Sequence, residues 1–408
     1  MSKSCEIGQA KELMSMMVEN SQRPDTGNLD FVEKVNDYLQ DFDCETRTVS
    51  DPEFDDRKLL IADFGDPDGQ QIFSVINHSD VVGVNALEWN TDPWKLHEEN
   101  GEWFGRGVCD THGSGVSMLL ALNSIDLIRE LRNNKQKMSL IFTYDEETPE
   151  QKMNFRGIKL AVGQLGVASV VDSKYFVVGE PTEIKGKMRA MIAQKGRWLA
   201  TYRTEVENPG HVSARVQNAL TLAMRIGSEI DTYAKNLQLG REEDVDAQLF
   251  NPPYSTIQIS AGEIKSSDYS STPKSASFSV DMRTLPLDNV HNERVWGMTD
   301  LILHRVQLQK GEKVFLEVLS NKPGTFTDIN SPIVKIAENV TRMKSVGFNG
   351  GEEGQTLRNA GHEGITMGPG DLKMAHRPNE SIKIQSVMGA IEKYELLYKA
   401  MIKLKERE

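Results

Sequence analysis

The sequence has only three cysteines, Cys5, Cys44 and Cys109, and contains no C-x-x-C pair. An odd, widely spaced set argues against a disulfide framework and against a zinc site built from thiolates. If the protein binds a metal ion, its ligands must therefore be histidine, aspartate and glutamate side chains.

Long apolar runs are also missing, since no stretch approaches the roughly 18 residues that a membrane span requires. The first residues, MSKSCEIGQAKELMSMM, predict an amphipathic helix and lack the apolar core and cleavage site of a signal peptide. Acidic residues (60) outnumber lysine and arginine (47), and the net charge of −13 argues against nucleic acid as a partner, which needs a basic face. We therefore expect a cytoplasmic protein with neither a membrane nor a nucleic-acid partner.

The apolar patterns predict a two-domain α/β protein. Strand-like runs alternate with helical patterns at the start and towards the end of the chain, which is typical of a sheet covered by helices. Between these parts the strand-like runs become longer. We expect an α/β domain formed by residues 1–186 and 298–408, with an inserted α+β domain at about 187–297.

Three helices within this plan are specified by their apolar spacing. The periodicity predicts one long helix over Gly113–Arg132, a helix over Asn292–Gln307, and a C-terminal helix over Ile382–Leu404.

Polar residues follow an apolar strand in SVINHSDVVG. His78 and Asp80 lie two residues apart and therefore on one face of an extended chain. His78 could bind a metal while Asp80 holds the far nitrogen of its ring. A turn with a capping aspartate at the end of a strand would give the same pattern.

The stretch RGVCDTHGSG raises three possible functions. A phosphate loop needs the pattern G-x-x-x-x-G-K-[ST], and the sequence has neither the lysine nor the glycine spacing. A nucleophilic Cys109 would need a histidine and an orienting partner, and a cysteine beside Val108 is more typical of a small buried side chain. Asp110, which precedes a helix, remains as a candidate metal ligand.

Three further segments place acids or a histidine behind apolar runs or in turns. SLIFTYDEETPE ends in Asp145, Glu146 and Glu147, YFVVGEPTE ends in Glu180, and GPGDLKMAHRPNESI carries His376. A solvated acidic turn would explain the first segment alone. Separate explanations for each of them are hard to find, and because strand ends of open α/β sheets converge on one crevice, we expect these side chains to lie together.

The ordered motifs resemble a known family. The string EWNTDPWKLHEENGEWFGRGVCDTHG is similar to a segment of the dinuclear zinc deacylase and aminopeptidase family that contains acetylornithine deacetylase and succinyl-diaminopimelate desuccinylase. The similarity continues through NHSDVV, DEE, GEPT, GHVSARVQNAL, DMRTLP and GPGDLKMAH, and it covers the chain from about Glu12 to Ala400. DMRTLP and GPGDLKMAHRPNES are most similar to the acetylornithine deacetylase branch.

The resemblance implies a centre of two divalent cations, Zn²⁺ or Co²⁺. Asp110 would bridge the ions, His78 and Glu180 would complete one, and Glu147 and His376 the other. A water held between two such ions loses its proton near neutral pH. The resemblance also implies a cis peptide after Asp110.

Other residues receive roles by the same comparison. Glu146 would take the proton of the water and return it to the leaving amine. His211, in the inserted domain, would donate to the tetrahedral oxyanion, and Arg283 would hold the carboxylate of the substrate. Asp80 would support the metal ligand His78.

Three positions depart from the family pattern. His112 replaces the usual lysine, Ser271 stands where asparagine precedes proline, and Gly351 begins the segment that usually reads Thr-Glu-Ala. We assign Ser271 and Gly351 to the substrate pocket, which therefore differs from the usual one.

The expected function is metal-dependent removal of an acyl group from an N-acyl amino acid, as in acetylornithine deacetylase. The resemblance implies that residues 1–186 and 298–408 form a catalytic α/β/α sandwich and that the inserted domain is its lid. The inserted domain implies a homodimer, because it is the lid and dimerisation domain in the resembled family. Alternatives are a desuccinylase, a dipeptidase or tripeptidase acting on short peptides, and a silent binding protein on the same fold. The presence of Glu146 favours an enzyme, since a pure binder needs no base beside its metals.

Overall fold

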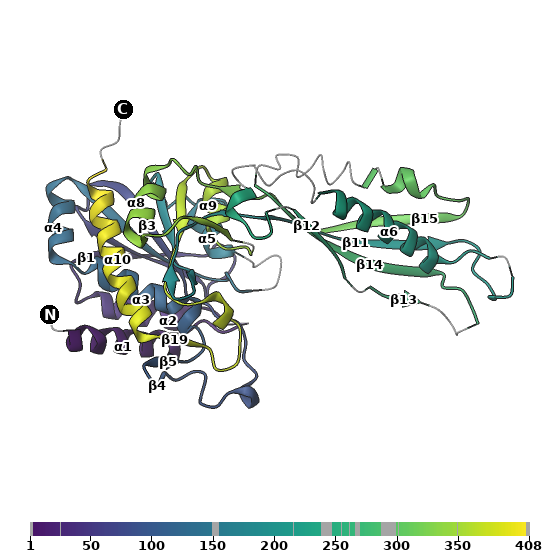
Figure 1. Ribbon diagram of the computed structural model, residues 1–408. Helices are drawn as coiled ribbons and strands as arrows, with labels where there is room; N and C mark the ends of the chain where they lie inside the picture. The colour runs from purple at the N-terminus through teal and green to yellow at the C-terminus, as the bar shows by residue number, and fades with distance from the viewer. Residues whose placement is uncertain are drawn as a thin grey trace. The chain divides into compact units, whose positions relative to one another are not determined.

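The computed structural model describes residues 3–24, 26–148, 155–214, 216–237, 247–253, 255–260, 262–265, 270–286, 299–300, 302–348 and 350–404. The chain divides into two compact units (Figure 1). The first comprises residues 1–192, 327–346 and 352–408, and the second comprises residues 193–326 and 347–351.

The second boundary between the units differs from the expected one. Residues 298–326, which the sequence assigned to the catalytic domain, belong to the second unit. The reason is strand pairing, because β15 (Glu312–Lys322) forms a long antiparallel ladder with β11 (Gly196–Val206). Pairing between segments more than 100 residues apart leaves no local signal in the sequence.

The first unit is built on a mixed sheet with the strand order β1-β2-β6-β3-β7-β18-β10. Its strands are β1 (Cys44–Ser50), β2 (Lys58–Gly65), β6 (Gln136–Thr143), β3 (Gln70–His78), β7 (Tyr175–Val178), β18 (Glu363–Thr366) and β10 (Met191–Gln194). Strand β3 runs parallel to β6 and β7, and β7 runs parallel to β18. β17 (Val346–Phe348) also pairs with β10.

Helices cover both faces of this sheet. They are α1 (Lys3–Glu19), α2 (Leu29–Leu39), α3 (Gly113–Leu122), α4 (Ile125–Asn133), α5 (Arg156–Ala161), α8 (Pro332–Thr341), α9 (Gly354–Asn359) and α10 (Ile384–Ile402). On one face Ile76 joins a buried cluster with residues of α5 and α9. On the other, Phe142 contacts Phe31 of α2 and Phe73 contacts Tyr398 of α10. The α/β/α layering therefore follows from strands that are apolar on both sides.

Two helices differ from their expected bounds. The helix expected over Gly113–Arg132 is two helices, α3 and α4, because Ser124 adopts an extended backbone between them. The C-terminal helix begins only at Ile384, since Ser381–Lys383 is strand β19 and pairs with β5 (Glu102–Phe104).

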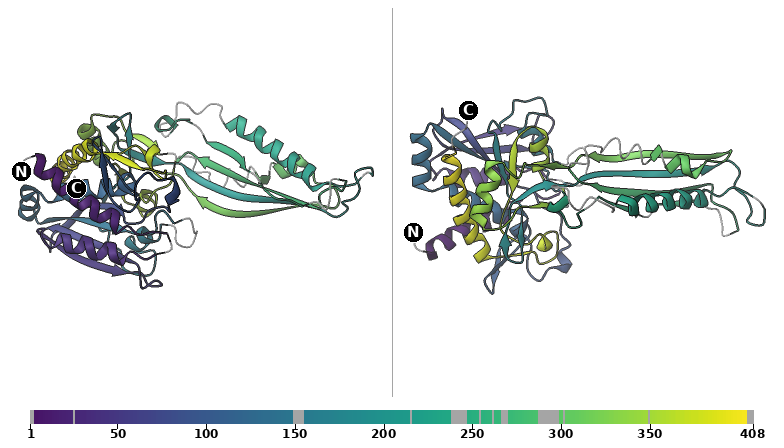
Figure 2. Two further views of the ribbon diagram at one scale, coloured as in Figure 1. Left: turned by 90° about the horizontal axis from the view of Figure 1, so that it is seen from below. Right: turned by 45° about the horizontal axis from the view of Figure 1, so that its top comes forward.

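The second unit has a sheet with the order β12-β14-β11-β15, and β13 also pairs with β14. Its other elements are β12 (Thr256–Ser260), β13 (Ile264–Lys265), β14 (Ser275–Thr284), β16 (Thr325–Phe326) and α6 (Ala219–Leu237). Figure 2 shows α6 lying along one face of this sheet, and Leu222, Ile226 and Ile230 of the helix join its buried core. The helix expected over Asn292–Gln307 lies partly outside the described residues, of which 302–306 are helical.

Smaller elements complete the chain. They are β4 (His97–Glu99), β8 (Glu183–Ile184), β9 (Lys187–Met188), and short helical turns at Ala86–Glu88, Val108–His112, Ala247–Leu249 and Leu372–Met374. Strands β19, β5 and β4 form a three-stranded sheet, and β8 pairs with β9. Of the helices that the structure describes, none is long and apolar enough to cross a membrane.

Candidate metal centre

The predicted ligands follow the carboxyl ends of three neighbouring parallel strands. His78 is the last residue of β3, Glu147 comes four residues after β6, and Glu180 comes two residues after β7. Because these strands run in the same direction, their ends lie at one edge of the sheet. The sheet topology thus brings together side chains that are about 100 residues apart in sequence.

Asp110 lies between two histidines. Its Oδ1 is 3.4 Å from Nε2 of His78, and its Oδ2 is 3.2 Å from Nε2 of His376. The residue sits in the π-helical turn Val108–His112 with a non-helical backbone, and its peptide bond to Thr111 is cis, as the resemblance implied. One carboxylate therefore presents each of its oxygens to a different nitrogen ligand.

The remaining acids lie beside the same histidines. Glu147 Oε1 is 2.8 Å from Nε2 of His376, and Glu180 Oε1 is 3.6 Å from Nε2 of His78. Ligand atoms of His78, Asp110 and Glu147 all lie within 4.8 Å of one another. The five side chains form two groups that share Asp110.

The ring of His78 is held by the backbone of Asp80. Its Nδ1 is 2.9 Å from the Asp80 carbonyl oxygen, which can only accept, so Nδ1 carries a proton and Nε2 is the ring nitrogen that faces Asp110 and Glu180. The sequence predicted this bond from the Asp80 carboxylate, but Oδ1 is 3.6 Å away. The other oxygen, Oδ2, accepts a hydrogen bond from the backbone of Glu147 at 2.7 Å. Asp80 therefore supports two candidate ligands at once.

The electrostatics of this cluster call for a cation. Burial and the nearby Asp110 raise the pKa of Glu147 to about 7 and that of Glu180 well above its usual range. Burial and the adjacent Glu147 carboxylate also raise the pKa of Glu146. His78 Nε2 and Glu180 Oε1 are buried and make no hydrogen bond within the described part of the chain. Unsatisfied donor atoms and crowded carboxylates are what divalent cations compensate, so these residues fit a metal centre.

The acidic turn that carries Glu146 and Glu147 is anchored through the residue before them. Asp145 is fully buried, accepts hydrogen bonds from Arg57 Nε at 2.8 Å and from Gln22 Nε2 at 2.6 Å, and has a left-handed backbone with φ of 57°. The ion pair with Arg57 and the hydrogen bond from Gln22 hold the turn in place, and the side chains of Glu146 and Glu147 remain partly exposed.

Neighbours of Asp110 serve packing and support. Cys109 is fully buried, and burial raises the pKa of its thiol well above the usual range, so it is not a thiolate nucleophile. His112 is also buried, lies 2.7 Å from Ser21 Oγ through its Nε2, and stacks on Phe31. The ring thus fastens the Asp110 turn to the end of α1.

Four predicted residues lie in the second unit. His211 is exposed and pairs as an isolated bridge with Ser271, and Gly351 is exposed as well. Arg283 Nε donates to Asp281 Oδ1 at 2.9 Å, so the guanidinium already has a partner on its own strand. The structure therefore separates the predicted residues into a metal-ligand group in the first unit and a second group elsewhere in the chain.

Sequence analysis missed several supporting residues. Arg57 and Gln22 contact the acidic turn from segments without a recognisable pattern. Glu380, which accepts hydrogen bonds from the Asp110 turn, lies in the RPNES segment directly after His376. Its position behind a predicted ligand is the one signal that could have identified it.

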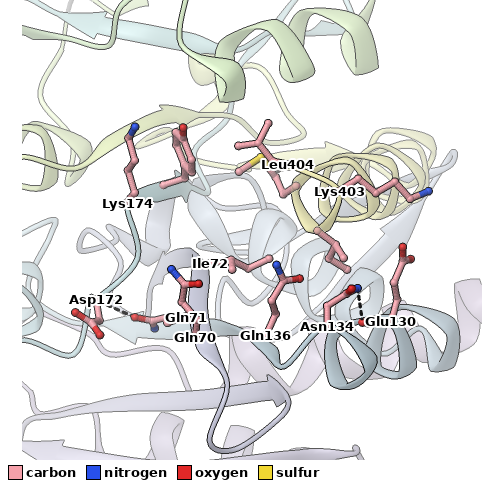
Figure 3. Close-up of a pocket in the computed structure, with 13 residues that line it drawn as sticks. Gln70, Gln71, Ile72, Glu130, Asn134, Gln136, Asp172, Lys174, Lys403 and Leu404 are labelled. Atoms are coloured by element: carbon pink, nitrogen blue, oxygen red, sulfur yellow. Dashed lines mark hydrogen bonds between the residues drawn. The ribbon is translucent and has the colours of Figure 1, made fainter. Parts of the chain in front are cut away.

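A surface pocket of about 560 Å³ lies at the other end of the same strands (Figure 3). Gln70, Gln136 and Tyr175, which begin β3, β6 and β7, line it together with residues after α10. None of the predicted metal ligands is among its lining residues. The pocket is therefore separate from the candidate centre.

Comparison with known proteins identifies the family. The model of peptidase family M20/M25/M40 matches residues 75–400. The chain belongs to this family. M20 enzymes are metal-dependent hydrolases that act on amide bonds, and this chain is one of them.

Individual relatives show the range within the M20 family. The acetylornithine deacetylase of Myxococcus xanthus is 26% identical over 335 residues, which cover 81% of this chain and 80% of that protein. A tripeptidase of Staphylococcus aureus has a TM-score of 0.74 at 15% identity, covering 98% of this chain and 99% of that chain. A dinuclear metal binding peptidase of Bacillus subtilis has a TM-score of 0.68 at 12% identity, covering 97% and 99%. These structures confirm the expected two-domain α/β fold.

Proposed function

We propose that this M20 hydrolase holds two divalent cations, Zn²⁺ or Co²⁺, and removes the acyl group from an N-acyl amino acid. The observation that carries the proposal is the carboxylate of Asp110, whose two oxygens face the Nε2 atoms of two different histidines at 3.4 and 3.2 Å. A carboxylate placed in this way could hold a different cation through each of its oxygens, whereas a mononuclear site would need only one of them.

The ligands divide into two sets around Asp110. His78 and Glu180 would hold one cation, and Glu147 and His376 would hold the other. When bound, a pair of such ions polarises the amide carbonyl and lowers the pKa of a water between them. The carbonyl of Asp80, which accepts from Nδ1 of His78, would leave Nε2 of the ring as the atom that holds the first cation.

Glu146 is proposed as the general base and acid. It follows Asp145 on the anchored turn and adjoins Glu147, so it lies next to a ligand without being needed as one. Its carboxylate would accept the proton of the attacking water and then donate it to the leaving amine. Burial and the neighbouring Glu147 carboxylate raise the pKa of this partly exposed group, which suits a group that must both take and release a proton.

Residues of the second unit are proposed to complete the reaction. Nδ1 of His211 lies 2.8 Å from Ser213 Oγ and accepts the backbone N–H of Ser213 at 3.3 Å. With Nδ1 engaged in this way, Nε2–H would be the donor to an oxyanion. Arg283 would bind the carboxylate of the substrate, with Ser271 and Gly351 shaping the pocket. Arg283 and Arg197 share the single carboxylate of Asp281, so the group keeps a net positive charge.

A homodimer through the second unit is part of this proposal. Strand β15 lies at an edge of its sheet and exposes Phe315, Val318 and Leu319. Exposed apolar side chains on an edge strand favour pairing with another copy of the chain. His211 would then act at the metal centre of the partner subunit.

A second candidate function is hydrolysis of dipeptides or tripeptides. It is supported by the likeness to a tripeptidase over nearly the whole of both chains. Desuccinylation is a further alternative, because the same centre accepts any acyl group that the pocket admits.

The test is a substrate screen with metal analysis. Chelated protein is reloaded with Zn²⁺ or Co²⁺ and offered N-acetylornithine, N-acetylcitrulline, N-succinyl-diaminopimelate, dipeptides and tripeptides, and released amine is measured. We expect two ions per chain and the fastest turnover with an N-acetyl amino acid. Faster cleavage of peptides would favour the peptidase function over the deacylase function. A single tightly bound ion would contradict the dinuclear centre.

A further inference from the structure

Glu380 is a fully buried carboxylate that is surrounded by donors. Its Oε1 accepts hydrogen bonds from the backbone N–H groups of Cys109 at 2.8 Å and Asp110 at 3.0 Å. Its Oε2 accepts from the backbone N–H of Gly107 at 3.2 Å and from Nη1 of Arg106 at 2.6 Å. Each carboxylate oxygen therefore takes two donors from the turn that carries the bridging aspartate.

This arrangement of donors requires an ionised carboxylate. All four groups can only donate, so an amide in place of the carboxylate would turn an NH₂ group towards N–H groups. The backbone can present its N–H groups in this way because Gly107 adopts a left-handed conformation with φ of 87°. Any other residue at Gly107 would be strained there, and its Cβ would lie 2.7 Å from the ring of His112.

Glu380 also belongs to the segment that carries another proposed ligand. It lies four residues after His376, and its carbonyl oxygen accepts a hydrogen bond from the backbone of Gly105 at 3.2 Å. The next residue, Ser381, begins the pairing of β19 with Phe104 of β5. Main-chain bonds and the side chain of Glu380 thus join the Asp110 turn to the His376 segment.

We propose that Glu380 is a positioning residue that fixes Asp110 relative to His376 and thereby sets the site of the second divalent cation. The proposal rests on the proposed function, since it assumes that Asp110 and His376 bind a common ion. The first cation would depend less on Glu380, because His78 is the last residue of β3 and Glu180 comes two residues after β7, so that both are held by the sheet.

The test measures the binding of Co²⁺ to the metal-free full-length protein, by calorimetry and by the visible absorption of the bound ion. For E380Q we expect the first cation to bind within about threefold of its wild-type affinity, and the second cation to bind roughly 10–100-fold less tightly. The absorption band of the second ion should weaken accordingly. E380D keeps the charge and should restore part of the affinity, with an intermediate shift.

Glu312 provides a matched control. It accepts hydrogen bonds from Arg225 at 2.8 and 3.1 Å and from the backbone of Gln309 at 2.9 Å, but it belongs to the second unit. E312Q removes a comparable ion pair and should bind both ions as wild type does.

The outcomes are distinct. If E380Q folds and binds both ions with wild-type affinity, the proposal is wrong. If E380Q does not fold, E380D decides, and wild-type affinity of E380D for both ions would likewise overturn the proposal. An equal loss in E312Q would assign the effect to general stability and also overturn it. If wild type itself binds fewer than two ions, the proposed dinuclear centre fails instead.

Discussion

The two sheets of this protein are buried in different ways. In the first unit β7 is buried along its whole length and β3 is buried almost throughout, since helices cover both faces. In the second unit β14 alternates strictly between buried and partly exposed residues, and β11 does so nearly throughout. A sheet covered on both faces favours charged side chains at the strand ends, whereas a sheet covered on one face carries polar side chains along its length.

The polar groups of the two units differ accordingly. At the strand ends of the first unit, His78 Nε2 and Glu180 Oε1 are buried and make no hydrogen bond to any described residue. On the open face of the second, Asp281 is shared between Arg197 and Arg283. Buried polar atoms that the protein leaves unsatisfied indicate a ligand, whereas paired surface charges are sufficiently explained by solvation.

The largest expected effect separates two adjacent acids of the first unit. E146Q should lower kcat by at least about 100-fold while leaving two ions bound, because it removes the base and no ligand. The matched variant E147Q should lose one ion together with activity. Turnover and metal content, measured on the same samples, check both. Loss of metal from E146Q alone would show that the roles of the two glutamates are exchanged.

The next effect tests whether the second unit takes part in catalysis. H211A should lower kcat by roughly 100-fold or more, as expected when a donor to the oxyanion is removed. If His211 acts across a dimer, equal amounts of H211A and E146Q chains, exchanged together, should recover about a quarter of wild-type activity. In half of the dimers, one site would then carry both defects and the other neither. If verified heterodimers recover no activity, His211 acts in the site of its own subunit. A protein that is a monomer in solution would exclude action of His211 across a dimer.

A smaller effect is expected at Arg283. R283Q should raise KM by roughly 10–100-fold for a substrate with a free carboxylate, the equivalent of one charge-assisted bidentate contact. R197Q is the matched control, because Arg197 is the cross-strand partner of Arg283 and binds the same Asp281. Equal changes in KM for both variants would point to the charge of the pair and not to a specific contact of Arg283.

The smallest effect concerns stability at the N-terminal end of α9 in the first unit. Glu353 is fully buried, and burial raises the pKa of its carboxyl to about 8 from an ordinary value of 4.5. The folded state therefore holds a proton that the unfolded state releases, so this group lowers stability as pH rises from about 4.5 to about 8. In the metal-free protein, the Tm of E353Q minus the Tm of wild type should increase by a few degrees as the pH is raised from about 4.5 to about 8. A difference independent of pH would contradict the assignment.

Part of the fold could be read from the sequence because its signals are local. Apolar runs in SVINHSDVVG, SLIFTYDEETPE and YFVVGEPTE predicted β3, β6 and β7, and the change in pattern near residue 187 predicted the first boundary, which lies at 192 in the structure. The second boundary could not be predicted, since β15 belongs to the second unit only through its pairing with β11. The break between α3 and α4 was missed because the apolar spacing continues across Ser124.

By itself, the sequence determined which residues are candidates for the chemistry. The scarcity of cysteine restricted metal ligands to oxygen and imidazole donors, and the apolar strands placed His78, Glu147 and Glu180 directly behind them. Only the tertiary structure decided how these groups meet. The two oxygens of Asp110 face different histidines because parallel strands bring their ends to one edge of the sheet, and because Glu380, 270 residues later, binds the Asp110 turn. Such contacts depend on the packing of distant segments, which no local pattern records.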